Sequence, residues 1–179
     1  QEELPQFRDR VKGYMLKAAR EAGVHTSWLR PDPEYEAALM RFVEAVLGGG
    51  ERSRFLGDLS RLQRRVAFYG AINSLAQTLI KIASPGVPDL YQGTETWDFS
   101  LVDPDNRRPV DFRRLSSAME ELRSQEEDLA GLAQELLEHW EDGRVKLFLT
   151  CRALNFRRTH SHLFQEGEYL PLEAPGEVQ

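Results

Sequence analysis

Apolar residues recur every three or four positions in several stretches of the chain, which is the spacing of one face of an α-helix. The first stretch covers residues 4–22 and is followed by Gly23, a residue type that commonly ends helices. The second begins after Asp32, a residue type that caps helices, with Pro33 at the first helical position, and ends at the glycines 48–50. The pattern predicts two helices joined by a short loop.

A third and longer helix is predicted over residues 52–82, where the apolar stripe continues through many turns. Its last half, 67–82, is apolar almost all round, which is typical of a helix that is buried on most sides or faces a missing partner. The periodicity stops at the Ser-Pro-Gly of 84–86. Residues 87–91 are predicted to be a short extended stretch, and residues 92–108 a polar loop long enough to suggest binding.

Helical spacing returns after Asp111, which is placed to cap a fourth helix. A fifth helix is predicted over 127–140 and is broken by the Asp-Gly at 142–143. Residues 145–160 fit either a strand or a helix, and the spacing of their apolar residues favours a helix. The tail 164–179 is interpreted as the entry to a strand.

Composition narrows the classes of protein that the chain can belong to. Apolar residues make up 41% and charged residues 29%, as in an ordinary globular protein. The net charge of -6 argues against a nucleic-acid partner, because phosphate contacts need lysine and arginine. The single cysteine, Cys151, fits a reducing, cytoplasmic compartment, and the sequence has no apolar run of the length that spans a membrane. Because the chain begins with a polar segment and Gln1 rather than Met, it is expected to be a piece of a longer polypeptide.

The candidate chemistry lies in residues 84–112, SPGVPDLYQGTETWDFSLVDPDNRRPVDF. Flat aromatic faces there can stack on sugar rings, and planar donors and acceptors can bind sugar hydroxyls. The aromatic residues are Tyr91, Trp97 and Phe99, and the polar ones are Gln92, Glu95, Asp98, Asp103, Asp105, Asn106, Arg107 and Arg108. The alternative is an ion-paired scaffold in which the two arginines bind Asp103 and Asp105, and side-chain chemistry alone favours this alternative. The pair His160 and His162 is too small a set to predict a metal site.

Within this segment, PGVPDLYQGTE resembles the eighth barrel strand and the following loop of the α-amylase superfamily. The continuation WDFSLVDPDNRRPVDF resembles more narrowly the family of maltooligosyl trehalose synthases. Two further stretches agree with that family: YMLKAAREAGVHTSWLRPDPEYEAALMRFV near the start, and GRVKLFLTCRALNFRRTHSHLFQEGEYLPL near the end. The resemblance therefore covers nearly the whole chain.

The resemblance implies a parent enzyme of trehalose biosynthesis. Such an enzyme is a glucan α-1,4-to-α-1,1 mutase, which converts maltooligosaccharides to maltooligosyl trehalose by intramolecular transglycosylation and needs no metal or organic cofactor. The family's catalytic carboxylates follow earlier barrel strands, and one of them stands in a His-Asp motif. No histidine of this chain precedes an aspartate, so no catalytic residue is expected here and the piece alone is expected to be inactive. Its expected partners are the maltooligosaccharide and the rest of the parent chain, which would hold the catalytic barrel.

The resemblance also implies a fold and a site. The expected fold is mainly α and helical-bundle-like, with one extended barrel-strand segment and a long polar loop, truncated before a C-terminal β-domain. Its expected parts are a helical insertion at 1–83, the strand and sugar-rim loop at 84–112, helices at 113–163 and the start of the β-domain at 164–179. The residues expected to face sugar are Tyr91, Gln92, Glu95, Asp103, Arg107 and Arg108. Two alternatives remain: a helical interaction module, or a piece of another α-amylase-type hydrolase or transglycosylase.

Overall fold

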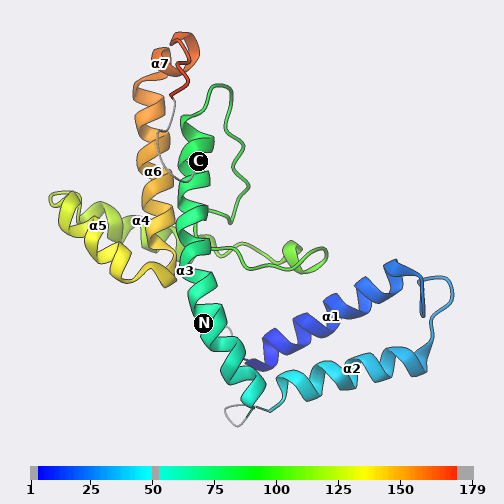
Figure 1. Ribbon diagram of the computed structural model, residues 1–179. Coiled ribbons are helices and arrows are strands. Elements are labelled where there is room, and N and C mark those ends of the chain that lie inside the picture. Colours follow the sequence, from blue (N-terminus) through cyan, green and yellow to red (C-terminus); the bar gives the residue numbers. More distant parts are fainter. Residues whose placement is uncertain (1–3, 50–52, 173–179) are drawn as a thin grey trace. The chain divides into compact units, whose positions relative to one another are not determined.

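The computed structural model describes residues 4–49 and 53–172, and every regular element in them is helical (Figure 1). The chain divides into two compact units. The first consists of Gln1–Tyr69 and Phe99–Pro109, and the second of Gly70–Asp98 and Val110–Gln179. The expectation of a mainly α protein is confirmed.

The first unit is built around two helices, α1 (Leu4–Ala22) and α2 (Pro33–Leu47), which lie side by side (Figure 1). Asp32 caps α2 as predicted, because its Oδ1 accepts hydrogen bonds from the amides of Glu34 and Tyr35 at 3.0 Å. The helix ends at Gly48. Both helix boundaries therefore follow from local capping and breaking residues in the sequence.

Ion pairs connect these two helices. Arg20 of α1 donates from Nε and Nη2 to the two carboxylate oxygens of Glu36 in α2, both at 2.7 Å. The hydroxyl of Thr26, a buried residue of the connecting loop, donates to Glu36 Oε1 at 2.6 Å. The hydrogen bonds from Arg20 and then from Thr26 lower the pKa of Glu36 from 4.5 to about 2. Through these hydrogen bonds, Glu36 of α2 connects that helix to α1 and to the loop between them.

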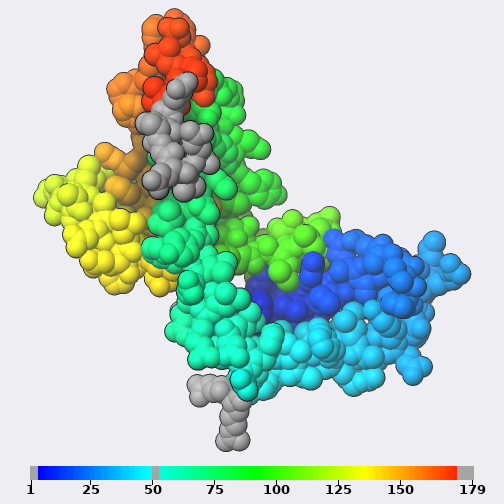
Figure 2. Space-filling view, in the orientation of Figure 1, coloured from blue at the N-terminus to red at the C-terminus, as the bar shows by residue number. Residues whose placement is uncertain are grey.

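The long helix α3 (Arg54–Ala83) contributes its first half to the first unit and its second half, from Gly70, to the second. The predicted third helix is thereby confirmed. In the first half, which Figure 2 shows at the surface, apolar side chains at spacings of three and four residues remain between 42% and 61% exposed. These residues are Phe55, Leu59, Leu62 and Val66, and we refer to them as the α3 stripe.

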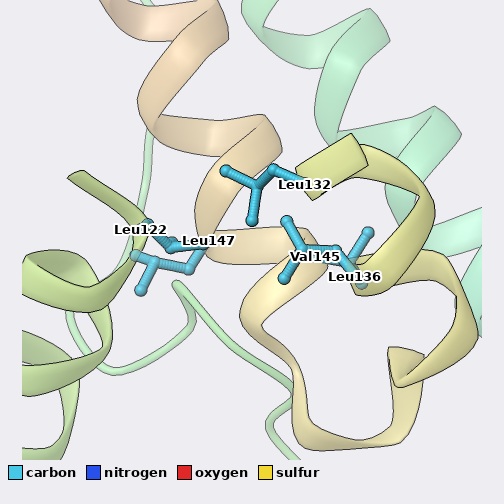
Figure 3. Packing of buried hydrophobic residues seen from close by; sticks show 5 residues of the cluster. All are labelled: Leu122, Leu132, Leu136, Val145 and Leu147. Atoms are coloured by element: carbon cyan, nitrogen blue, oxygen red, sulfur yellow. The ribbon is translucent and has the colours of Figure 1, made fainter. Parts of the chain in front are cut away.

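The second unit contains four further helices, three of which pack around a small apolar core. They are α4 (Phe112–Ser124), α5 (Leu129–Glu138), α6 (Arg144–Thr159) and α7 (Ser161–Glu166). The short turns η2 (Asp105–Arg107) and η3 (Trp140–Asp142) belong to the first and second units respectively. Figure 3 shows the core residues converging from α4, α5 and α6: Leu122, Leu132, Leu136, Val145 and Leu147. The fourth, fifth and sixth predicted helices are confirmed, including the ambiguous segment at 145–160.

The predicted barrel strand is wrong. Residues 87–90 have no regular structure, 91 also lies outside any strand, and residues 4–49 and 53–172 contain no strand at all. A strand needs a neighbouring strand for its hydrogen-bond ladder, and the described part of the chain supplies none. The same holds for residues 167–172, which follow α7 without forming a strand. The predicted division of the chain into four parts stays a prediction, and residues 173–179 of the predicted β-domain start lie outside the described residues.

No helix within the described ranges is long and apolar enough to cross a membrane.

Candidate functional site

The six residues predicted to face sugar fall into two groups, one in each unit. Asp103, Arg107 and Arg108 belong to the first unit, in the segment that follows Asp98. Tyr91, Gln92 and Glu95 belong to the second, after the end of α3. The structure brings the members of each group together, so each group is a local arrangement with its own supports.

In the first unit, the loop is held against α1 by Arg10 and Asp105. Arg10 Nε donates to Asp105 Oδ1 at 2.9 Å and Nη2 donates to Oδ2 at 2.7 Å. Arg10 Nη2 also donates to the carbonyl of Phe99 at 2.8 Å, and the amide of Leu101 donates to Asp105 Oδ2 at 2.6 Å. Both charged side chains are only 14% exposed. The hydrogen bonds from Arg10 lower the pKa of Asp105 from 3.8 to about 2, against a burial effect that raises it.

Asp103 and Arg107 form an exposed ion pair in the same loop as Asp105. Arg107 contacts Asp103 Oδ1 through Nε, while 76% of its side chain remains exposed. Lys17 of α1 donates to the carbonyl of Asp103 and lies 3.9 Å from its Oδ2. The peptide bond between Asp103 and Pro104 is cis. The pair therefore offers a carboxylate and a largely open guanidinium, which are the group types that bind sugar hydroxyls in two-point contacts.

Arg108 turns back along its own loop. Its Nε donates to the carbonyl of Asp105 at 3.1 Å and lies 3.4 Å from Asp105 Oδ1, and its Nη2 donates to Ser100 Oγ at 3.3 Å. The ion pairs of the scaffold alternative, Arg107 with Asp103 and Arg108 with Asp105, are thus present. They restrict the loop without covering it, because both arginine side chains are more than half exposed.

In the second unit, Tyr91 begins a tight turn. The amide and the hydroxyl of Thr94 donate to the Tyr91 carbonyl at 3.1 and 2.6 Å. Gly93 has φ 89°, and a Cβ there would lie 2.9 Å from a methyl carbon of Val110, so both conformation and space favour glycine. Glu95 closes the turn by accepting the Gly93 amide at 2.7 Å. Tyr91 is 72% exposed, which leaves its ring free to stack on a sugar face.

Trp97, one of the three aromatic residues considered for stacking, has a different role. Its indole N–H donates to the Trp140 carbonyl at 2.6 Å, and the two rings meet edge to face with centroids 6.4 Å apart. Gly143, with φ 84°, lets the backbone approach, because a Cβ there would lie 3.0 Å from the Trp97 amide nitrogen. Trp97 therefore fixes the loop to the core of the second unit.

The sequence reasoning missed the basic residues that support the loop from α1. Arg10 and Lys17 contact Asp105 and Asp103 respectively. They stand two helical turns apart and therefore on one face of α1. That spacing was readable in the sequence, but nothing local indicated which acids they would meet. Residues 4–49 and 53–172 contain no group of three or more histidine, cysteine or acidic side chains that could hold a metal ion.

Comparison with known proteins gives consistent matches to one family, although no profile of a known protein family matches the chain. A Mycobacterium tuberculosis protein, provisionally named maltooligosyl trehalose synthase, is 36% identical over 170 residues, which is 95% of this chain and 19% of the relative. The crystal structure of a maltooligosyl trehalose synthase is 37% identical with a TM-score of 0.82, covering 94% of this chain and 22% of that protein. A hypothetical maltooligosyl trehalose synthase of Sulfolobus tokodaii is 32% identical with a TM-score of 0.78, covering 95% of this chain and 21% of that one.

These matches run along almost the whole chain, so they include both loop groups and their supporting helices. The chain spans only 19% of the length of the curated relatives. In sequence and in fold, this chain is similar to one segment of the maltooligosyl trehalose synthases.

Proposed function

We propose that this chain is the part of a maltooligosyl trehalose synthase that binds the glucan beside a catalytic centre located elsewhere in the parent protein. The observation that carries the proposal is the match to such synthases over 95% of the chain at 36% identity, together with the TM-score of 0.82 to a solved one. The parent would convert maltooligosaccharides to maltooligosyl trehalose.

The proposed reaction follows the retaining glycosidase scheme. A carboxylate of the parent attacks the anomeric carbon, and a glycosyl-enzyme forms as the reducing-end glucose leaves with a proton from the acid residue. That glucose turns and reattaches through its 1-OH, whose proton returns to the same residue acting as a base. Because water must not replace the glucose during the turn, the enzyme has to retain it between the two steps.

The exposed polar and aromatic residues of the two loop groups could hold the released glucose between the two steps. The open edge of Arg107 and the carboxylate of Asp103 offer donors and acceptors within one ion pair, and Arg108 stands on the same loop. We assign these residues to glucose hydroxyls near the reducing end. In the second unit, Tyr91 offers its exposed ring to a sugar face, and Gln92 is exposed beside it. Glu95 shapes the turn that presents both residues.

The test uses the full-length protein that contains this chain. With maltopentaose as substrate, the expected product has an α-1,1 terminal linkage and no reducing end. Arg107→Ala should lower kcat/KM about tenfold or more, equivalent to roughly 1.4 kcal/mol of lost binding in the transition state. Arg61→Ala is the matched control, because Arg61 also pairs with a nearby acid, Asp58, on the exposed surface of α3.

Two results would count against this assignment. Shorter reducing maltooligosaccharides as the main products would favour another α-amylase-type hydrolase or transglycosylase. If Arg107→Ala still forms maltooligosyl trehalose with unchanged kinetics, the proposed family assignment would stand. The ion pair between Arg107 and Asp103 would then have a scaffold role and not a role in sugar binding.

The α3 stripe supports the proposal that this chain packs against the rest of its parent. Four large apolar side chains on one helical face stay substantially exposed, and exposed apolar surface of this kind marks a contact with a partner. The same stripe is the observation that favours a helical interaction module as the second candidate. If the chain is only a helical interaction module, the full-length protein should have no activity on glucans. The maltopentaose assay therefore distinguishes this candidate from the synthase. A reducing compartment, expected from the single Cys151, stays a prediction.

A further inference from the structure

The backbone at the end of α3 is bound by a side chain of another helix, α6. The last carbonyl groups of an α-helix find no donor within the helix and need one from elsewhere. Arg157 supplies it: Nη1 donates to the carbonyls of Ile82 at 2.5 Å and Ser84 at 2.8 Å, and Nη2 donates to the carbonyl of Gly86. One guanidinium thus binds three backbone positions that stand 71 to 75 residues earlier in the sequence.

This contact depends on the shape of arginine. A guanidinium presents its donors in a flat, rigid fork, whereas the ammonium of lysine is a single point of charge. The fork of Arg157 also lies over the ring of Phe164 in α7, with 4.7 Å between its central carbon and the ring centroid. Its positive charge stands at the carboxyl end of α3, where the helix dipole favours a cation. Arg157 is therefore held in one orientation by both of its surroundings.

Arg157 fixes a flexible joint. Gly86 has φ 101°, and a Cβ there would meet nothing within 4 Å, so its conformation and not a lack of space favours glycine. A glycine at this point would by itself allow the chain to leave α3 in many directions. Because Arg157 binds the carbonyls of both Ser84 and Gly86, it selects one of them.

The chain between Gly86 and Tyr91 is short and stiff. The ring of Pro88 fixes its own φ and restricts Val87 to an extended conformation. The side chain of Val87 is 96% exposed, so side-chain packing does not hold this part of the chain. The direction set at Gly86 is therefore carried to Tyr91, where the tight turn begins.

We propose that Arg157 is a positioning residue, which sets the place of the turn at Tyr91 through the carbonyls of Ser84 and Gly86. Its consequence for glucan binding rests on the proposed function, in which the Tyr91 ring stacks on a sugar face and Gln92 lies beside it. Arg157 acts through the backbone and not through contact with sugar, because its guanidinium is engaged by three carbonyls and the Phe164 ring.

Hydrogen exchange tests the positioning without any sugar. The Ser84 amide donates to a carbonyl of α3 at 2.8 Å, and the Thr94 amide donates to the Tyr91 carbonyl at 3.1 Å. In the full-length protein, Arg157→Lys should speed the exchange of both amides about tenfold, because the joint and the turn then open more often. Faster exchange at Ser84 alone would confine the effect of Arg157 to the end of α3 and would overturn the proposal.

The matched control is Arg158→Lys. Arg158 is the next residue of α6, is exposed, and donates to Asn155 of the same helix at 2.8 Å. This substitution makes the same chemical change beside Arg157 and should leave both exchange rates within about twofold of wild type. Equal acceleration in the two lysine variants would also contradict the proposal.

Kinetics with maltopentaose test the consequence for glucan binding. Stacking on Tyr91 stabilises the ground state and the transition state alike, so Arg157→Lys should raise KM about fivefold and leave kcat within about twofold. In a Tyr91→Ala background, the same substitution should change KM by less than about twofold, because the ring to be positioned is gone. Where Tyr91→Ala itself raises KM, an undiminished effect of Arg157→Lys in that background would overturn the proposal.

The two measurements separate a failure of this inference from a failure of the proposed function. If Tyr91→Ala leaves KM unchanged while Arg157→Lys still speeds exchange at Thr94, the role of Tyr91 in sugar binding is wrong and positioning by Arg157 stands. If Tyr91→Ala raises KM and Arg157→Lys changes neither KM nor the exchange at Thr94, the sugar-binding role stands and positioning by Arg157 is wrong.

Discussion

Arg10 and Asp105 stand 95 positions apart in the sequence and meet through two hydrogen bonds, at 2.9 and 2.7 Å. The contact joins the middle of α1 to the loop that carries Asp103, Arg107 and Arg108. Asp105 contributes all its side-chain oxygens to this anchor and to the Leu101 amide. A mutation of Arg10 should therefore act on the proposed glucan binding through loop position and not through contact with sugar.

We predict that Arg10→Lys loosens the loop without unfolding α1. Lysine keeps the charge but cannot form the two-point contact with a carboxylate. The amide of Leu101 should then exchange its hydrogen roughly tenfold faster, as measured by native-state hydrogen exchange. Arg10→Lys and Asp105→Asn should be strongly non-additive, because each removes the same contact. Additive effects on the Leu101 exchange rate would show that the two residues are not coupled.

Acid should weaken the first unit through Glu36 and Asp105. Their pKa values are lowered from 4.5 and 3.8 to about 2, so the folded state favours the ionised carboxylates. Their contribution to stability is complete above pH 4.5 and is lost as the pH falls toward about 2. Denaturant titrations across this range should show a declining free energy of unfolding. Glu36→Gln should flatten the decline, while Glu34→Gln, an exposed acid of the same helix, should leave its slope unchanged.

Arg144 is predicted to be the most sensitive charged residue of the second unit. Its guanidinium contacts Asp142 at 2.7 Å, Glu121 at 2.8 Å and Glu135 at 2.6 Å, and only 16% of the side chain is exposed. Arg144→Met leaves three acids facing one another and should cost roughly 1–3 kcal/mol in the free energy of unfolding. Arg113→Met on the exposed surface of α4 is the control, expected within about 0.5 kcal/mol of wild type. Equal losses in the two variants would contradict the role of Arg144.

Two glycines should respond to alanine in opposite directions. Gly143→Ala places a Cβ at positive φ and within 3.0 Å of the Trp97 backbone, so it should destabilise by roughly 1–3 kcal/mol. Gly70 lies inside α3, and a Cβ added there would meet nothing within 4 Å, so Gly70→Ala should stabilise by about 0.5–1 kcal/mol. Thermal unfolding of both variants measures the two shifts, and a destabilising Gly70→Ala would show that this glycine serves another purpose.

The helices could be predicted because their signals are local. Asp32 and Asp111 each cap a helix by accepting amides two or three residues ahead, and the apolar spacing between caps needs no knowledge of distant partners. The end of α1 before Gly23 and both boundaries of α2 follow directly from such signals. Even residues 145–160, whose composition also fits a strand, follow the helical spacing of their apolar residues.

The structure of residues 84–112 could not be predicted in the same detail, because it depends on residues far away in the sequence. A strand at 87–91 requires strands that the described chain lacks, so the motif alone gave the wrong secondary structure. Trp97 and Tyr91 are both aromatic residues of one polar segment, yet Trp97 donates to Trp140 while Tyr91 is exposed. Nothing within the segment distinguishes the two. The contact between Arg10 and Asp105 likewise pairs two residues that neither helix spacing nor loop composition connects.

The packing of Trp97 against Trp140 gives the second unit its own optical reporter. Of the chain's three tryptophans, these two lie at one core, and Trp28 belongs to the first unit and is 59% exposed. Indole emission shifts to longer wavelength in contact with water, so the pair should emit at shorter wavelength than Trp28. With Trp28 replaced by phenylalanine, the fluorescence of the remaining pair would follow the melting of the second unit without a label.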